Sequence, residues 1–474
     1  MRVVLVQAPA RNLKFNIGGY FKILPLGIAY LAGALEDARI PFQVYFPKPS
    51  DNFFGEYTKL METQKSRPLI VGVSATLFAA REAFRLAHIA KAINPENIVV
   101  LGGAVTSFHP EVIFHYSRDI DYIVRENAEH VFLLLVLALQ EGRDVRGIPN
   151  IAFRQDAQTI CTGERDFGDI DAIKLPLREA FPRWAHILHP PMGRYAPGYL
   201  VETMRGCSYK CMFCSLPKKL QMRSVKSVIV ELDNLCGRFG AREVYFIDPT
   251  FTLDKQRTYE LCEQMMASRI KLQWSCMTRV DCIDEELAGM MRTAGCDLIH
   301  FGVESATPQI LRDLKKDQGV TDAISAFRAC EKLGIRTGAF MIIASTIHDT
   351  DETLREAVAL IKKLRPTYVL YDHIKPIPNR PFTHNAIEQQ IITDADLEEF
   401  YLGNKEKSRL CEITISGIPR TRAEDWVARA SRDFYLSPLN ISRILSCLRT
   451  KNDAINLLKA GFYYYKEMYV RSEW

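Results

Sequence analysis

Short apolar, β-branched runs alternate with amphipathic stretches from residue 2 to about residue 150. The runs predict strands at residues 2–7, 42–46, 69–74, 97–103 and 122–126, and the stretches between them predict helices at residues 26–38, 80–93 and 128–141. Because this order builds parallel βαβ units, we expect an open, doubly wound α/β sheet over residues 1–149. Ligands of such sheets bind beyond the carboxyl ends of the strands, here the loops at residues 8–27, 74–79, 102–109 and 126–129.

The alternation restarts after residues 150–195, an irregular segment rich in Pro, Asp and Arg that we expect to be a linker or a docking segment. Further strands are predicted at residues 199–203, 242–248, 271–278, 297–304, 336–344 and 368–374, and helical stretches follow all but the last. Six βα units of this kind favour a partial (β/α)6 barrel over residues 196–385. Its active site is expected at the carboxyl ends of the strands.

From residue 386 to residue 474 the apolar spacing is helical, which predicts a helical C-terminal domain. Its last part is dense in aromatic residues, among them Tyr463, Tyr464, Tyr465 and Tyr469. Packing against the barrel would explain such a tail. The alternative is a wall of a hydrophobic substrate pocket, or a peripheral contact with a membrane surface.

The composition narrows the class of protein. A chain of 474 residues with 47% hydrophobic and 25% charged residues is long enough for about three globular domains. The net charge of +5 is small and unclustered, so we expect no nucleic-acid partner. No apolar run approaches the roughly 20 residues of a transmembrane helix, and residues 1–8 lack a cleavage site, so a cytoplasmic location is expected. We therefore expect the twelve cysteines to stay reduced.

Three of these cysteines, Cys207, Cys211 and Cys214, lie in one polar loop directly after the first strand of the predicted barrel. Three thiolates at this spacing suit one face of a cubane iron–sulfur cluster and leave the fourth iron without a protein ligand. A zinc site would need a fourth ligand, and none follows nearby at the usual spacing. A chance group of buried cysteines is the other alternative.

The CxxxCxxC pattern at this place resembles the signature of the radical S-adenosylmethionine (SAM) superfamily. The resemblance implies a 4Fe–4S cluster whose open iron binds SAM. Reduction by a donor such as flavodoxin or ferredoxin then cleaves SAM to a 5′-deoxyadenosyl radical. Phe213, immediately before the last cysteine, matches the family's aromatic residue near the adenine.

Other barrel positions resemble the family's SAM-binding residues. Asp248 matches its acidic strand end, and Glu304 matches a residue that contacts the methionine or ribose part, with a helix cap as the alternative. Arg279 pairs with the cofactor carboxylate or forms an ordinary ion pair; Lys316 matches less well. Residues 344–349 and 378–381 depart from the family's usual turns at the barrel mouth, which leaves the substrate open.

The N-terminal domain, placed directly before this barrel, resembles the cobalamin-binding subfamily. Gly102 and Gly103 suit a close backbone approach to the ligand, or a plain strand-to-helix turn, and Ser74 and Thr76 could hydrogen-bond the corrin periphery. No histidine precedes His88, so the histidine that lies beneath cobalt in other cobalamin domains is missing. The resemblance therefore implies cobalamin bound without that ligand.

Together these features predict a cobalamin-dependent radical methyltransferase acting on an unactivated carbon. The resemblance implies one SAM that yields the radical and a methylcobalamin that delivers the methyl group. A large apolar substrate, such as a hopanoid lipid, would suit the aromatic tail. The alternatives are a radical cyclase or dehydratase acting on tetrapyrroles or aminoglycosides, and a sensor that binds cobalamin or a cluster without turnover. Tyr371, Asp372 and His373 are candidates for substrate contact by position alone.

Overall fold

The computed structural model describes residues 1–9, 24–48, 52–156, 158–186, 188, 193–268, 270–405, 408–411, 416–446, 448, 454–455 and 457–458. These fall into two compact units. Unit 1 comprises Met1–Ala185 and Asp394–Cys411, and unit 2 comprises His186–Thr393 and Glu412–Trp474. The expected boundaries differ from this division, because most of the expected linker and one segment of the expected C-terminal domain belong to unit 1. The aromatic tail around Tyr463 to Tyr469 lies outside the described residues.

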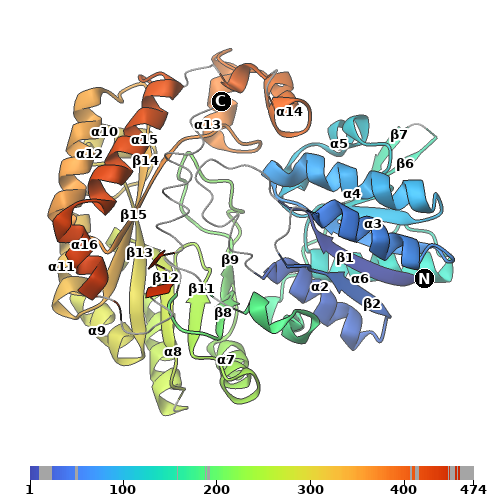
Figure 1. The fold of residues 1–474 in the computed structure, drawn as a ribbon, viewed down its shortest axis with the longest axis horizontal. Helices are drawn as coiled ribbons and strands as arrows, with labels where there is room; N and C mark the ends of the chain where they lie inside the picture. The colour runs from blue at the N-terminus through green and yellow to red at the C-terminus, as the bar shows by residue number, and fades with distance from the viewer. Residues whose placement is uncertain are drawn as a thin grey trace. The chain divides into compact units, whose positions relative to one another are not determined.

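Unit 1 is built on a seven-stranded sheet in the order β2-β1-β3-β4-β5-β6-β7 (Figure 1). Its parallel strands are β1 (Arg2–Gln7), β2 (Phe42–Tyr45), β3 (Leu69–Ser74), β4 (Ile98–Gly102) and β5 (Tyr122–Val124). The helices that connect or follow these strands are α2 (Leu26–Asp37), α3 (Phe53–Thr63), α4 (Ala80–Ile93), α5 (Pro110–Tyr116) and α6 (Ala128–Glu141). Helices α2 and α6 pack together, as do α3 and α4 on the other face. The predicted doubly wound sheet is confirmed, and α3 and α5 are additions to the predicted helices.

An antiparallel hairpin of β6 (Ile151–Gln155) and β7 (Gln158–Cys161) extends this sheet within the segment expected to be a linker. Arg154 anchors it. Its guanidinium donates hydrogen bonds to four carbonyl groups just before β5, at distances of 2.5–3.3 Å, and lies over the Phe114 ring. The segment is therefore part of the sheet, held by a side chain that satisfies several backbone acceptors at once.

Helix α14 (Asp394–Tyr401) follows the barrel in the chain and yet belongs to unit 1. The Tyr401 ring is 5.4 Å from the Phe78 ring and 6.1 Å from the Phe108 ring, centroid to centroid. Phe78 and Phe108 lie in the loops after β3 and β4, so α14 packs at the carboxyl edge of the sheet. Tyr401 is 3% exposed, which marks this as a packed contact.

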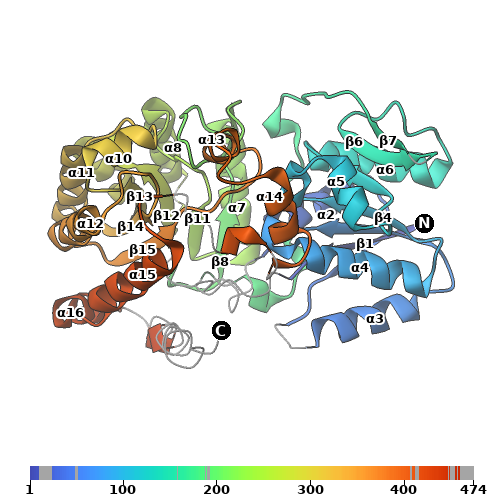
Figure 2. The same cartoon turned by 90° about the horizontal axis from the view of Figure 1, so that it is seen from above.

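Unit 2 is a curved six-stranded parallel sheet in the order β15-β14-β13-β12-β11-β8. Its strands are β8 (Gly198–Val201), β11 (Glu243–Phe246), β12 (Gln273–Arg279), β13 (Cys296–Glu304), β14 (Arg336–Ile343) and β15 (Tyr368–His373). The helices of the unit are α7 (Val225–Phe239), α8 (Lys255–Ala267), α9 (Glu285–Thr293), α10 (Pro308–Asp313), α11 (Val320–Lys332), α12 (Asp351–Leu364), α13 (Pro381–Glu388), α15 (Arg420–Tyr435) and α16 (Pro438–Ser446). Figure 2 shows α10, α11 and α12 along the outside of the sheet. The predicted partial barrel is confirmed.

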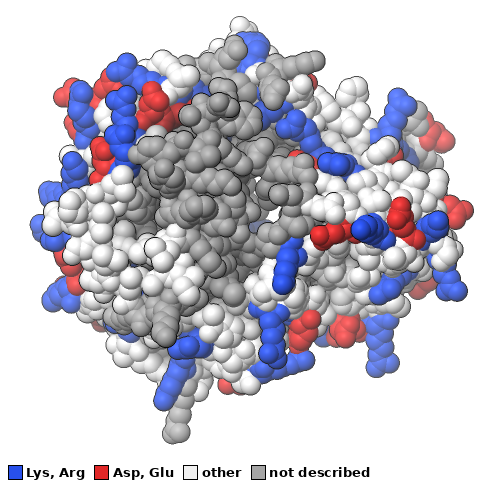
Figure 3. Space-filling model, in the orientation of Figure 1, with Lys and Arg blue, Asp and Glu red and all other residues white. Residues whose placement is uncertain are grey.

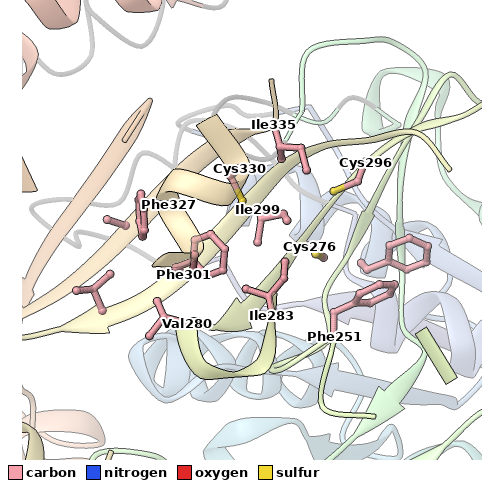
Figure 4. Close-up of a cluster of buried hydrophobic side chains, with 14 of the residues drawn as sticks. Phe251, Cys276, Val280, Ile283, Cys296, Ile299, Phe301, Phe327, Cys330 and Ile335 are labelled. Atoms are coloured by element: carbon pink, nitrogen blue, oxygen red, sulfur yellow. The ribbon is translucent and has the colours of Figure 1, made fainter. Parts of the chain in front are cut away.

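The two faces of this sheet differ in what they bury. Side chains that point outward, among them Cys276, Ile299 and Phe301, pack against the surrounding helices and loops through residues such as Val280 and Phe327 (Figure 4). Because strand side chains alternate, the residues between these outward-facing ones point to the concave inner face of the half-barrel, which we call the lumen. The half-buried or exposed apolar ones are Leu200, Ile247, Met277, Phe340, Ile342 and Leu370.

Helix starts and the sheet edge are fixed by local hydrogen bonds. The side chains of Ser224, Asp254 and Asp284 accept backbone N–H groups at the starts of α7, α8 and α9. At the edge strand β15, the Tyr435 hydroxyl donates to the Val369 carbonyl (2.7 Å) and accepts from its N–H (3.1 Å). Helix α15 thereby covers the edge of the half-barrel.

In the part of the chain that the structure describes, no helix has both the length and the apolar character needed to cross a membrane. On the face drawn in Figure 3, basic and acidic side chains are interspersed rather than gathered by sign.

Candidate active site

The cysteine loop is closed at its base by a two-stranded antiparallel pair. In this pair β9 (Met204–Arg205) runs into the loop and β10 (Gln221–Met222) runs out of it. Gly206 makes the turn with φ of 77°, and a Cβ there would lie 2.1 Å from the Lys219 carbonyl oxygen. Only glycine fits this turn without moving the backbone. The loop is thus a fixed feature at the carboxyl end of β8, where the sequence places it.

The three thiols differ in exposure. Cys207 and Cys211 are each 7% exposed, and Cys214 is half-buried. Burial raises the pKa of the Cys211 thiol, whereas the nearby charges of Lys316 and Arg279 lower it. Among the described residues, no three Cys, His, Asp or Glu side chains gather around a point as one metal ion requires. The donor chemistry, three thiols with cations beside them in a closed loop, fits a cluster in which three irons each take one thiolate and the fourth iron stays open.

Asp248 lies directly beneath the start of this loop. Its carboxylate is fully buried and accepts hydrogen bonds from the Thr203 N–H (2.7 Å), the Thr203 hydroxyl (2.5 Å) and the Met204 N–H (3.0 Å). Burial raises its pKa to about 6, against the effect of those bonds. The contacts that the structure gives Asp248 are therefore to the strand that enters the cysteine loop. Its contact with a cofactor stays a prediction.

Arg279, at the end of β12, connects the loop to the barrel. Its guanidinium forms a two-pronged ion pair with Asp281 at 2.7 and 2.8 Å and lies 3.8 Å from the Tyr209 ring centroid. One nitrogen is 3.9 Å from the Cys211 sulfur, and another donates to the Lys316 carbonyl (2.5 Å). The ordinary ion pair expected as an alternative is thus present. Pairing with a cofactor carboxylate stays a prediction.

Glu304 ends β13 at a bulge, in the left-handed backbone conformation (φ 65°). Its Oε1 accepts a hydrogen bond from Lys316 Nζ at 2.8 Å, and both side chains are 7% exposed. Lys316 Nζ also lies 5.6 Å from the centre of the Phe213 ring. The structure therefore brings together Phe213, Arg279 and Glu304, which the sequence places far apart. Lys316, which matches the family pattern less well, is the side chain between Phe213 and Glu304.

The candidates at the end of β15 divide between the two faces of the sheet. Tyr371 is 3% exposed and packs in the outer core, whereas Asp372 points to the opposite, lumen side and pairs with Lys375 (2.8 Å). Burial, aided by Lys375, lowers the pKa of His373 to about 4, so that side chain is neutral at pH 7. The alternation leaves Asp372 as the lumen candidate.

The predicted cobalamin residues line the carboxyl edge of the sheet of unit 1. Gly103 has φ of 89°, and a Cβ there would lie 2.6 Å from the Ala75 carbonyl oxygen and 3.1 Å from the Ser74 hydroxyl. The loop after β4 therefore lies in close backbone contact with the loop after β3. A Cβ at Gly102 would lie 3.9 Å from the Val124 carbonyl oxygen, an ordinary van der Waals contact, and Thr76 is exposed with no capping bond. These small and polar groups fit a ligand that lies over the edge, although their contact with it stays a prediction.

Comparison with known proteins agrees with both halves of this description. Residues 201–361 match the family model of the radical SAM superfamily, and residues 19–136 match that of the B12 binding domain. The chain is 30% identical to an uncharacterized methyltransferase from Pyrococcus horikoshii over 402 residues, which cover 83% of this chain and 84% of the relative. The chain belongs to the cobalamin-binding subfamily of the radical SAM superfamily. It is a radical SAM enzyme whose cofactors are a 4Fe–4S cluster, SAM and cobalamin.

Two further proteins place this radical SAM enzyme among its relatives. It is 28% identical to an anaerobic magnesium-protoporphyrin IX monomethyl ester cyclase from Rubrivivax gelatinosus, over 80% of this chain and 68% of the cyclase. The solved structure of the radical SAM methyltransferase TsrM from Kitasatospora setae, with cobalamin and a 4Fe–4S cluster bound, shares its fold. The TM-score is 0.66 at 20% identity, over 82% of this chain and 75% of that one.

Sequence reasoning missed two contributors to the site of this radical SAM enzyme. Tyr209, inside the cysteine loop, lies under Arg279 and has its hydroxyl 3.0 Å from the Cys282 sulfur. Gly302 leaves the space that the Glu304 carboxylate and the Lys316 ammonium occupy. An aromatic residue within the CxxxCxxC loop was a visible signal for the first. A glycine two residues before a strand-end glutamate gave no signal for the second.

Proposed function

We propose that this protein is a cobalamin-dependent radical SAM methyltransferase that adds a methyl group to an unactivated carbon. The observation that carries the proposal is a combination of features on one chain. A closed three-cysteine loop at the mouth of a half-barrel and a cobalamin-type sheet occur on one chain, and a methyltransferase relative covers most of that chain. An unactivated C–H bond resists acid–base chemistry, which accounts for a pair of cofactors able to supply a radical and a methyl group.

When bound, the cluster and SAM supply the radical that abstracts a hydrogen atom, and cobalamin supplies the methyl group. The residues of the chain position and shield this chemistry. Cys207, Cys211 and Cys214 would hold the cluster in a loop that Asp248 and Gly206 fix at its base. Glu304 would present a carboxylate oxygen to the amino or hydroxyl groups of SAM. Apolar lumen residues would exclude water and so limit side reactions of the reactive intermediates.

The lumen supports an apolar substrate. Leu370, 46% exposed on the inner face of β15, is paired in register with Phe340, and Phe340 is paired with Gly302. These three positions form one row across the sheet, next to the Glu304 site. Exposed aliphatic and aromatic side chains facing a reaction site favour an apolar ligand surface. The proposed substrate is a large apolar metabolite, and a hopanoid lipid is the more specific proposal within that class.

A radical cyclase is the second candidate, because a relative of that name is 28% identical over 80% of the chain. A tetrapyrrole macrocycle is also large and apolar, so the lumen does not separate the two functions. A dehydratase acting on aminoglycosides would need a more polar wall. A sensor without turnover would leave the carboxylate–ammonium pair of Glu304 and Lys316 without a reaction to serve.

The experiment begins with anaerobic purification from cells supplied with cobalamin, followed by quantitation of iron, sulfide and cobalamin. The protein is then incubated with SAM, a reductant and an apolar substrate panel that contains hopanoids and tetrapyrroles. We expect about four irons and one cobalamin per chain, 5′-deoxyadenosine, and a product heavier by one CH2 group. A cluster without cobalamin would overturn methyl transfer. So would a product without the added CH2 group: loss of two hydrogens would favour oxidative cyclisation, and loss of one water would favour dehydration.

Cys211→Ala is the control variant, because it removes one cluster ligand and is expected to abolish 5′-deoxyadenosine. A flavodoxin or ferredoxin electron donor, a cytoplasmic location and a peripheral contact with a membrane stay predictions. That the protein has no nucleic-acid partner also stays a prediction.

A further inference from the structure

Lys316 lies where three parts of the site of unit 2 meet. Its ammonium group is 2.8 Å from Glu304 Oε1 at the end of β13 and 5.6 Å from the centre of the Phe213 ring in the cysteine loop. Its carbonyl oxygen accepts a hydrogen bond from Arg279 at the end of β12. One buried lysine therefore contacts two strand ends and the loop that carries the cluster ligands.

The backbone around Lys316 is shaped for these contacts. Lys315 and Asp317, which flank it, both have left-handed backbone conformations, with φ of 49° and 45°. Such conformations are uncommon for residues other than glycine and persist only where the surroundings impose them. The preceding carbonyl, that of Leu314, accepts the N–H of Met212 at 2.9 Å. The segment 314–317 is thus fastened to the cysteine loop on one side, and it directs the Lys316 side chain inward on the other.

Gly302 makes room for the ion pair. A Cβ at this position would lie 2.5 Å from Glu304 Oε1 and 2.7 Å from Lys316 Nζ, closer than real Cβ contacts. Gly302 does not have a positive φ, so a glycine is not needed here for its backbone conformation. It is needed because a side chain would occupy the space of the ion pair. Any larger residue on this inward-facing position of β13 would displace the carboxylate or the ammonium group.

A buried carboxylate without a cation is costly, so removal of one partner from such a pair disturbs the other. Among the described residues, Lys316 is the hydrogen-bond donor found for the Glu304 carboxylate, and it engages Oε1 alone. The second oxygen stays available to a ligand with ammonium or hydroxyl donors. SAM carries both kinds of group.

We propose that Lys316, seated by Gly302, is a positioning residue for SAM. Its ammonium group fixes the Glu304 carboxylate and the Phe213 ring in a single arrangement before SAM binds. It acts through these two side chains and does not itself ligate the cluster. The inference rests on the cofactor set of the radical SAM family and is independent of which substrate is methylated.

The test measures SAM binding on protein with an intact cluster, without any substrate. Lys316→Met removes the charge at nearly constant length, and Gly302→Ala keeps every charge but crowds the pair. We expect both variants to retain the iron content of the wild type, to bind SAM at least tenfold more weakly, and to lose the SAM-induced change in the electron paramagnetic resonance spectrum of the reduced cluster. Lys315→Met is the matched control, because it removes an exposed lysine one residue away and is expected to bind like the wild type.

A merely structural Lys316 would give a different result. Loss of the Lys316 ammonium group would then lower the melting temperature and the iron content. Protein that retained its cluster would still bind SAM within twofold of the wild type. That result in both variants would overturn the proposal. If Lys316→Met does not fold, Gly302→Ala alone decides, on the same affinity criterion. Failure of the methyl-transfer proposal would instead appear as missing product with SAM binding intact.

Discussion

At the scale of single residues, the site depends on carboxylates whose partners come from distant parts of the chain. Asp248 fits the family pattern of an acidic strand end, yet its oxygens are taken by Thr203 and Met204, some 45 residues earlier. Neither spacing nor periodicity contains such a contact. The three cysteines were predictable, because they lie within eight residues and their chemistry is local. The pairing of Glu304 with Lys316 needed the bulge in β13, which only the folded sheet defines.

Glu243, at the start of β11, allows a pH prediction. Burial raises its pKa to about 7, although the Arg194 and Tyr195 N–H groups donate to it. A carboxyl whose pKa is raised on folding favours the folded state while protonated, and that stabilisation is lost as pH rises from about 4.5 to about 7. We therefore expect the free energy of unfolding of the apoprotein to fall by about 2 kcal/mol over this range through Glu243.

Glu243→Gln stays neutral at every pH and can still accept both N–H bonds. It is expected to flatten this dependence and to be more stable than the wild type at pH 8, as measured by urea unfolding at pH 5 and pH 8. Glu260→Gln, on the exposed side of α8, should leave the wild-type pH dependence in place. Equal pH dependence in the wild type and in Glu243→Gln would show that Glu243 does not titrate in this way.

At the scale of helices and strands, the βαβ repeats could be predicted because each depends on contacts between neighbours in sequence. The parallel strands of both sheets lie within a few residues of their predicted positions. The β6–β7 hairpin was missed, since Gln158–Cys161 has no apolar run and the hairpin is anchored by the hydrogen bonds of Arg154. An edge strand that pairs on one side and buries little apolar surface leaves no periodic signal.

The edge of the half-barrel gives a prediction at this scale. Tyr435→Phe removes the hydroxyl that donates to and accepts from Val369, and so takes this partner away from the Val369 N–H and carbonyl at the edge of β15. Loss of these two hydrogen bonds is expected to cost about 1–3 kcal/mol of unfolding free energy, measured by urea unfolding. It should also speed hydrogen exchange at the Val369 amide. Tyr259→Phe, on α8, is the control; if its cost equals that of Tyr435→Phe, the hydroxyl does not hold the edge.

At the scale of the whole molecule, chain order and structural units do not coincide. The sequence suggested consecutive domains at residues 1–149, 196–385 and 386–474, because composition and periodicity change near those points. Unit 1 nevertheless includes residues 394–411, whose helix α14 packs on the loops after β3 and β4. Sequence pattern predicts that a helix forms, but its amphipathic face does not identify the sheet against which it packs. The parts of unit 1 that carry Ser74, Thr76 and Gly103 therefore depend on a segment that follows the barrel.

The dependence of unit 1 on helix α14 can be tested by removing the Tyr401 ring. Tyr401→Ala removes a ring that is 3% exposed and contacts Phe78 and Phe108, which should cost about 3–5 kcal/mol of the stability of unit 1. Because Phe78 and Phe108 belong to the loops that carry the predicted cobalamin residues, cobalamin per chain after anaerobic purification is expected to fall well below the wild-type value while iron per chain is unchanged. Tyr401→Phe keeps both ring contacts and should retain cobalamin. If Tyr401→Ala loses iron and cobalamin equally, the helix stabilises the chain as a whole; if it loses neither, the carboxyl edge of unit 1 is complete without α14.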